Sequence, residues 1–169
     1  IALSGGSDSV ALTFLLHALG SSSRFTVAGV VHLNHQLRQV ADDDEKFCRQ
    51  LAKQLSLRFE VGRSDVRGKA KAEGISIEEA GHRARHAFFD YALSKMNADC
   101  VATAHTRDDQ AETYLMRLIR GAGPEGLSGI WPRSGNIIRP LLDVTKTELR
   151  EHLVSQGILF CEDETNFDT

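Results

Sequence analysis

The sequence predicts an α/β fold in which a parallel sheet is covered by helices on both faces. Short apolar segments alternate with longer segments of helical periodicity, which is typical of right-handed β-α-β crossovers. The run FTVAGVVHL at 25–33 is apolar throughout, as expected of a parallel strand that is buried on both faces. With 169 residues, 41% of them hydrophobic, the chain can form one domain with a sizeable core.

The predicted strands are short. Residues 1–3 resemble the end of a buried strand, and a whole strand usually has about five residues. We therefore expect that the natural N-terminus has been trimmed. The apolar run at 25–33 is the second strand, and residues 58–62, 100–104 and 137–138 complete the expected set.

Five segments carry apolar residues at helical spacing, namely 8–20, 42–55, 76–96, 108–120 and 145–156. Ser76 followed by Glu79 predicts a capping box at the start of the third helix. In the fourth helix, Leu115, Leu118 and Ile119 are expected to face the core. Residues 121–136 contain five glycines and two prolines, which predicts a loop.

The composition excludes some classes of protein. No apolar run approaches the ~20 residues that span a bilayer, and three scattered cysteines predict no disulfide framework, which favours a cytoplasmic protein. The net charge of −3 gives no global sign of nucleic-acid binding. Local basic residues at 63–71 are typical either of a phosphate-binding surface or of an ordinary solvated one.

Parallel sheets bind ligands at the carboxyl ends of their strands. Three segments follow predicted strands at that edge, namely 4–9, 32–38 and 105–112. These segments hold the most unusual residues of the chain, so the chemistry is expected there.

The first of these segments, Ser4-Gly5-Gly6-Ser7-Asp8-Ser9, has the composition of a phosphate-binding loop. Its glycines permit a tight turn and close approach of a ligand, and the free N–H groups of the following helix favour an anion. Asp8 beside an anion suggests a bridging Mg²⁺ ion. The alternative is a capped strand-to-helix turn, because Ser and Asp are good N-caps.

The third segment begins a helix with His105, Asp108, Asp109 and Glu112 spaced to share one face. Carboxylates at a ligand-binding edge suit Mg²⁺ or an amine substrate. The alternative is purely structural, since the helix dipole favours acidic residues in a first turn.

Ser-Gly-Gly-x-Asp-Ser at 4–9 resembles the pyrophosphate-binding loop of the PP-loop ATP pyrophosphatases. His-x-x-Asp-Asp-Gln-x-Glu-Thr at 105–113 resembles the second signature of the tRNA(Ile)-lysidine synthase family within that superfamily. Further segments similar to this family lie at 33–38, 74–80, 120–127, 139–142 and 162–166. The resemblance covers nearly the whole chain. It departs at Asn34, where many members have Asp or His, so no acid-base role is expected there.

The resemblance implies an adenine nucleotide alpha hydrolase-like, Rossmann-like fold and a ligase reaction in two steps. ATP binds with its triphosphate on residues 4–9 and its adenine near Ala2, Leu3 and His32, and Asp8 positions Mg²⁺. The wobble cytidine of tRNA(Ile) attacks the α-phosphate through its C2 oxygen and releases pyrophosphate. The ε-amine of free L-lysine then displaces AMP at C2 and gives lysidine.

The resemblance also suggests roles for residues of this chain. The catalytic or lysine-binding candidates are Asp8, His105, Asp108, Asp109 and Glu112, and the candidates for phosphate or tRNA contacts are Arg38, Arg83, Arg85 and Arg120. Residues 1–169 would form the ATP-binding catalytic domain, and the C-terminal tRNA-binding domains of the family would lie outside the chain. The alternatives are another PP-loop enzyme, such as a tRNA thiolation enzyme or an ammonia-dependent synthetase, and a non-catalytic nucleotide-binding module.

Overall fold

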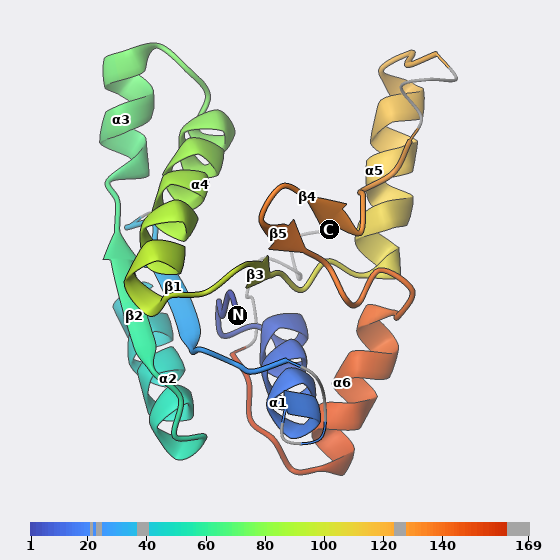
Figure 1. Cartoon of the computed structure of the whole chain (residues 1–169). Coiled ribbons are helices and arrows are strands. Elements are labelled where there is room, and N and C mark those ends of the chain that lie inside the picture. The colour runs from blue at the N-terminus through green and yellow to red at the C-terminus, as the bar shows by residue number, and fades with distance from the viewer. Residues whose placement is uncertain (21, 23–24, 37–40, 124–127, 162–169) are drawn as a thin grey trace.

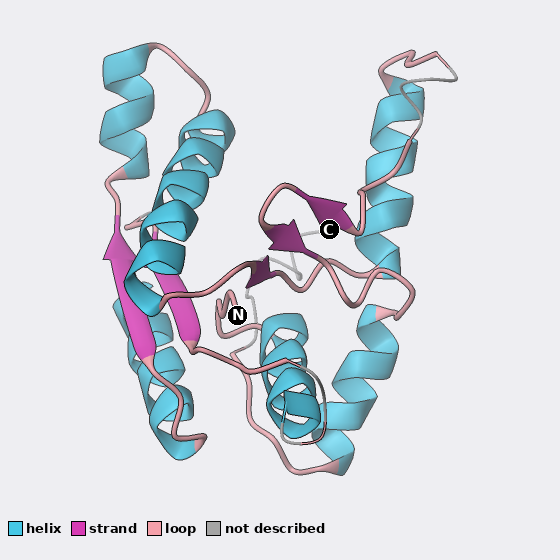
Figure 2. Ribbon diagram, in the orientation of Figure 1, coloured by secondary structure: helices cyan, strands magenta, loops and turns pink. Residues whose placement is uncertain are grey.

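The computed structural model describes residues 1–20, 22, 25–36, 41–123 and 128–161. Helices surround a central sheet, and the arm formed by α3 and α4 stands opposite α5 (Figures 1 and 2). The helices are α1 (Ser7–Gly20), α2 (Ala41–Gln54), α3 (Val66–Glu73), α4 (Ile77–Met96), α5 (Arg107–Ile119) and α6 (Lys146–Ser155). The strands are β1 (Val30–Asn34), β2 (Phe59–Arg63), β3 (Val101–Ala102), β4 (Arg133–Ser134) and β5 (Ile137–Ile138).

The N-terminal residues join two groups of strands into one sheet. β1 pairs in parallel with β2, while β3 pairs in parallel with β5, and β4 runs antiparallel to β5. Between the two groups lies Ile1–Leu3, since Leu3 N–H donates to Val31 at 2.9 Å and Ala2 N–H donates to Ala102 at 2.9 Å. The order is therefore β2, β1, residues 1–3, β3, β5 and β4, and the predicted parallel α/β fold is confirmed.

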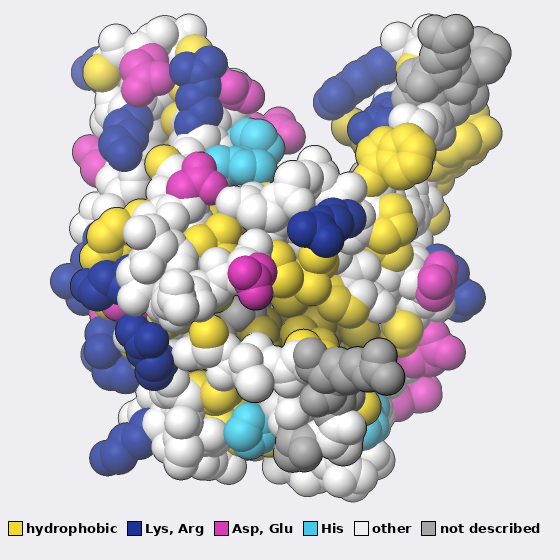
Figure 3. Space-filling model, viewed as in Figure 1, with side chains coloured by type: hydrophobic (Ala, Val, Ile, Leu, Met, Phe, Trp, Pro, Cys, Tyr) yellow, Lys and Arg dark blue, Asp and Glu magenta, His cyan; other side chains and the backbone are white. Residues whose placement is uncertain are grey.

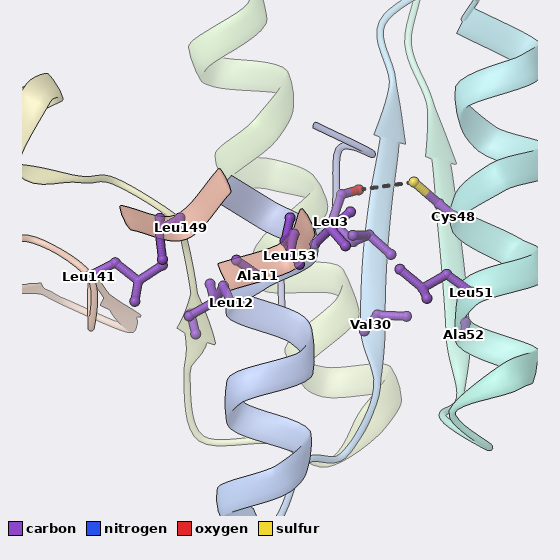
Figure 4. Packing of buried hydrophobic residues seen from close by; sticks show 12 residues of the cluster. Leu3, Ala11, Leu12, Val30, Cys48, Leu51, Ala52, Leu141, Leu149 and Leu153 are labelled. Atoms are coloured by element: carbon purple, nitrogen blue, oxygen red, sulfur yellow. Dashed lines mark hydrogen bonds between the residues drawn. The ribbon is translucent and has the colours of Figure 1, made fainter. Parts of the chain in front are cut away.

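Successive residues of the strands enter cores on opposite faces of this sheet. Val30 packs with α1, α2 and α6 in one cluster, whereas its neighbour Val31 packs with Phe88 and Phe89 of α4 in the other. Figure 4 shows the first cluster, in which the Cys48 thiol donates to the Leu3 carbonyl at 3.7 Å. Burial on both faces explains why β1 begins with consecutive apolar residues instead of an alternating pattern.

The contact between α1 and α6 gives a stability prediction. Leu153 of α6 is fully buried against the first cluster, whereas its neighbour Val154 is 64% exposed. We expect Leu153→Ala to lower the free energy of unfolding by about 2–5 kcal/mol, because it removes buried methyl groups and leaves a cavity. Val154→Ala should change it by less than about 0.5 kcal/mol. Urea denaturation of both variants measures the difference, and equal losses would contradict the packing described here.

Several predicted boundaries were too generous. The strand predicted at 25–33 begins only at Val30, and the one predicted at 100–104 is confined to Val101–Ala102. The loop predicted at 121–136 contains β4, which turns into β5 through Gly135 at a φ of 58°. A strand of two residues forms only a few hydrogen bonds to its neighbour, and two residues are too few to show the periodic pattern from which strands are predicted.

Helix α3 was not predicted. Its caps are regular, since the Asp65 side chain accepts the N–H of Gly68 at 2.8 Å and Gly74 ends the helix at a φ of 66°. It packs on α4 through Val66, Ala70 and Ala80. The predicted capping box of α4 is half formed, because Ser76 accepts the Glu79 N–H while the Glu79 carboxylate binds Arg83. None of the helices in the described ranges is long and apolar enough to cross a membrane.

The inward orientation predicted for α5 is wrong. Leu115, Leu118 and Ile119 are 54%, 50% and 80% exposed, and α5 has no buried residue. The helix projects beyond the sheet (Figure 1), so its apolar residues have no core to enter within the described part of the chain.

Candidate functional site

A cleft of about 1020 Å³ opens at the carboxyl edge of the sheet. It lies between the α4 side and the α5 side of the molecule, where Figure 3 shows a hollow between two projecting arms. All three segments predicted to carry chemistry contribute to its lining. The predicted residues that it brings together are Ser4, Gly6, Ser7, Asp8, Ser9, His32, Arg85, His105 and Asp109.

The Ser4–Ser9 loop is shaped from inside by one hydroxyl. Ser9 is buried, and its Oγ accepts the N–H groups of Ser4 and Gly5 at 3.1 and 3.2 Å while donating to the Gly6 carbonyl at 2.9 Å. Gly5 has a φ of 101°, a left-handed conformation that favours glycine. Ser9 therefore organises the turn, and the first-turn N–H groups of α1 remain the donors that suit an anion.

Asp8 lies in the first turn of α1 and lines the cleft. Its Oδ1 accepts a hydrogen bond from the Ser7 hydroxyl at 3.2 Å. Burial raises the pKa of the Asp8 carboxyl, and the charges of Asp109 and Asp108 add to the rise, whereas Ser7 and Lys146 oppose it. The neighbouring groups thus do not fully offset the cost of burying the negative charge of Asp8. A cationic ligand would offset it, which makes Asp8 a candidate binding residue.

The two aspartates at the start of α5, Asp108 and Asp109, have different partners. Asp109 Oδ2 completes a capping box with Thr106, and its Oδ1 accepts from the Lys146 ammonium at 2.9 Å. Burial acts to raise the pKa of Asp109, but the bonds from Lys146 and Thr106 outweigh it and leave the pKa below its ordinary value. Asp108 instead accepts the backbone N–H of Lys146 at 2.9 Å, at the start of α6. Glu112 is exposed and does not line the cleft.

Two histidines of the cleft are fixed by their neighbours. The Nδ1 of His32 lies 2.8 Å from the Leu3 carbonyl, which only accepts, so Nδ1 donates this hydrogen bond. The Nε2 of the same ring is buried and has no partner among the described residues. His105 Nδ1 lies 3.0 Å from the Thr103 hydroxyl, and burial followed by the charge of Arg139 lowers the pKa of His105.

The four predicted arginines do not form one group. Arg85 lines the cleft. Arg83 points elsewhere and pairs with Glu79 and Glu73 at 2.7 and 3.3 Å. Arg120 is exposed at the end of α5 and is not part of the lining. Arg38 lies outside the described residues.

The cleft residues to which the sequence analysis gave no role include Lys146 and Arg139. A lysine at the first position of a helix opposes the helix dipole, and this conflict was a usable signal for Lys146. Arg139 follows β5 directly at the carboxyl edge of the sheet, but a strand of two residues is too short to reveal that place from sequence.

Comparisons with known proteins show the family of the chain. The family described as "PP-loop domain" matches residues 1–169. The tRNA(Ile)-lysidine synthase of Geobacter sulfurreducens is 45% identical over 99% of this chain, and that of Thermosipho africanus is 40% identical over 100%. The chain spans 36% and 39% of the lengths of these two relatives.

Similar folds occur among solved structures. A U34-tRNA thiolase from Methanococcus maripaludis matches with a TM-score of 0.79 at 16% identity, covering 99% of this chain and 59% of that one. An NH3-dependent NAD synthetase from Campylobacter jejuni matches with a TM-score of 0.57 at 17% identity, covering 98% and 64%. At these identities the likeness concerns the fold. Because the PP-loop family covers the chain from end to end and the Ser4–Ser9 loop stands at the head of the cleft, the chain belongs to the PP-loop domain family.

Proposed function

We propose that this chain is the ATP-using catalytic part of a tRNA(Ile)-lysidine synthase. The observation that carries the proposal is one cleft in which the Ser4–Ser9 loop faces the carboxylate of Asp109. An anion-binding loop and an amine-binding carboxylate are what a reaction of ATP with lysine requires. The names of the relatives at 40–45% identity support the same activity.

ATP would bind with its triphosphate on the Ser4–Ser9 loop and the start of α1. Adenine would lie near Ala2, Leu3 and His32, which line the same cleft. Arg85, Arg139 and Lys146 place positive charge around the cleft, where phosphate groups would gather.

The reaction would proceed in two displacements. The C2 oxygen of the wobble cytidine forms a bond to the α-phosphorus of ATP, and the bond to the leaving pyrophosphate breaks. The ε-amine of L-lysine then bonds to C2, and AMP leaves with the former C2 oxygen. The proton lost from the amine requires an acceptor, and His105 is the candidate because it lines the cleft and burial lowers its pKa, which favours the neutral ring that can accept a proton.

Asp8 fits a Mg²⁺ ion that is held together with substrate phosphates. Mg²⁺ commonly binds through one or two carboxylates together with substrate phosphates, and it offsets phosphate charge when bound. The described residues contain no group of three or more His, Cys, Asp or Glu that could hold a metal, so phosphate oxygens would complete this site. Asp8, with its raised pKa, is the carboxylate that would gain most from such a cation.

The ion pair of Asp109 with the Lys146 ammonium, 2.9 Å apart, supports Asp109 as a carboxylate that could bind an amine. A substrate lysine carries the same ammonium group. We therefore place the lysine site at Asp109, while Asp108 serves the start of α6 and Glu112 lies one turn farther from the cleft.

The proposal is tested with the full-length protein, ATP and a tRNA(Ile) transcript. We expect pyrophosphate release that depends on tRNA, and incorporation of radiolabelled lysine that depends on ATP. Adenylated tRNA without lysine incorporation would indicate another PP-loop tRNA-modifying enzyme. ATP binding without either product would indicate a nucleotide-binding module.

This chain by itself is expected to bind tRNA weakly. Its net charge is −3, and basic residues are only locally concentrated. The affinity should fall steeply with salt, because phosphate contacts release counterions. Filter binding at increasing salt concentrations measures both quantities, and tight binding that ignores salt would contradict the expectation.

A further inference from the structure

Arg139 is a cleft cation without a carboxylate partner in the described ranges. It lines the cleft just after β5, and its Nε is buried without a hydrogen-bond partner there. Burial lowers the pKa of Arg139, and no described charge offsets that loss of solvation. A partly buried guanidinium of this kind has unused donors that suit a phosphate.

Arg139 is hydrogen-bonded to the backbone of an exposed aromatic residue, Trp131. Arg139 Nη1 donates to the Trp131 carbonyl at 2.8 Å, and the Arg139 backbone N–H donates to the Pro132 carbonyl at 2.8 Å. Trp131 is 66% exposed although it directly follows Ile130, a lining residue of the cleft. Trp131 thus pairs an exposed indole with a backbone that is hydrogen-bonded to a cleft guanidinium, and an exposed aromatic face near a cation suits the stacking of a base.

The backbone around Trp131 is held in place from α5. The Gln110 amide donates to the Ile130 carbonyl at 2.8 Å, and its oxygen accepts the Ile130 N–H. Arg117, seven residues farther along α5, donates to the Ser128 carbonyl. These bonds fix the segment before binding, which lowers the entropy lost when a ligand stacks on it.

We propose that Trp131 and Arg139 bind one unpaired RNA nucleotide at the mouth of the cleft, with the base stacked on Trp131 and its phosphate on Arg139. The inference rests on the proposed function, because it assigns this nucleotide to the strand that carries the reacting cytidine. A base splayed out of a loop needs an aromatic face and a cation for its phosphate, and these two residues supply both. Gln110 acts as a positioning residue for this site.

Trp131 is the single tryptophan of the chain, so its fluorescence reports this site alone. The probe is a fluorescein-labelled RNA hairpin with an unpaired cytidine in its loop, added to this chain at low salt. We expect RNA to quench the tryptophan emission in parallel with the rise in fluorescein anisotropy. Trp131→Ala should weaken binding about 5- to 100-fold, the range typical of one base stacked on an aromatic ring. Trp131→Phe should retain most of the affinity.

Arg139→Gln should reduce the slope of log affinity against log salt by about one, as expected for one lost phosphate contact. The matched control is Tyr91→Ala, which removes an aromatic residue that is 50% exposed on α4 and whose hydroxyl bonds Glu60 and Lys95, away from Arg139. Its RNA affinity should equal that of the wild type. Thermal unfolding of each variant separates loss of binding from loss of folding.

RNA binding that leaves the tryptophan emission and the Trp131→Ala affinity unchanged would overturn this inference and leave the proposed function standing. Absence of any RNA binding at low salt would also overturn this inference, whereas the proposed function is tested separately by the activity of the full-length protein. Quenching by ATP alone would assign Trp131 to the nucleotide substrate instead. Emission that changes with protein concentration in the absence of RNA would make Trp131 a protein contact, which also overturns the inference.

Discussion

Asp8→Asn is expected to reduce tRNA-dependent pyrophosphate release by about 100-fold or more, the scale on which a single electrostatic group at a reacting phosphate acts. Asn keeps the size and the hydrogen-bond acceptor that the Ser7 hydroxyl uses, but it removes the charge that would hold Mg²⁺ against the phosphates. Release is measured with saturating tRNA and lysine. Activity within a few-fold of the wild type would remove Asp8 from the mechanism.

The same substitution is expected to stabilise the fold at neutral pH. Because burial raises the folded-state pKa of Asp8 above its unfolded value, the ionised carboxylate opposes folding at neutral pH. This unfavourable contribution disappears as the pH falls below the unfolded pKa of about 3.9. Asp8→Asn should therefore have a higher Tm than the wild type at pH 7, and the difference should vanish near pH 3.9 or below.

Asp8→Asn also removes one negative charge from the protein. A matched control tests whether that loss alone changes the Tm. Asp99 is exposed in the loop before β3 and does not line the cleft. Asp99→Asn should leave both the Tm and pyrophosphate release close to wild-type values. A loss of Tm for Asp8→Asn at pH 7 would contradict the unfavourable burial of Asp8.

Asp109→Asn is expected to raise the Michaelis constant for lysine by about 10- to 100-fold. The estimate follows from one charge-assisted hydrogen bond of about 1.5–3 kcal/mol to the substrate ammonium. The effect should exceed that of Glu112→Gln, since Glu112 lies outside the cleft lining. Adenylated tRNA and the lysidine product are assayed separately, so that binding of lysine is distinguished from the first step.

Asp108→Asn serves as the neighbouring control, because Asp108 accepts the Lys146 backbone N–H at the start of α6. It should lower thermal stability slightly and change the lysine constant less than Asp109→Asn does. Loss of adenylation in Asp109→Asn without lysine would assign this carboxylate to Mg²⁺. If neither step changes in any of these variants, the helix dipole suffices to explain the acidic segment and the lysine site is wrong.

The sequence by itself determined the α/β class, five of the helices and the segments at which the cleft forms. These features rest on local chemistry, namely strand-like apolar runs, helical periodicity and the glycine and serine residues of the Ser4–Ser9 loop. The carboxyl-edge rule needs only the order of strands and helices, so it located residues 4–9 and 105–112 before their contacts were known.

Only the tertiary structure decided which side chains of those segments enter the cleft. Helical spacing put Asp108, Asp109 and Glu112 on one face. In the structure, however, Asp108 accepts the backbone N–H of Lys146 at the start of α6, whereas Asp109 forms an ion pair with the Lys146 side chain. Spacing within one helix cannot specify a partner that lies 38 residues away. The places of Arg139 and Lys146 in the site could not be predicted from the sequence for the same reason, because the cleft residues around them belong to other helices and strands.

The exposure of α5 has a related cause. Its apolar residues at 115, 118 and 119 satisfy the periodic pattern of a buried helix, yet the helix extends past the edge of the sheet. Periodicity describes which residues share a helical face, whereas burial depends on whether another element covers that face. The first is a property of the local sequence, and the second is set by how far the sheet and its other helices extend.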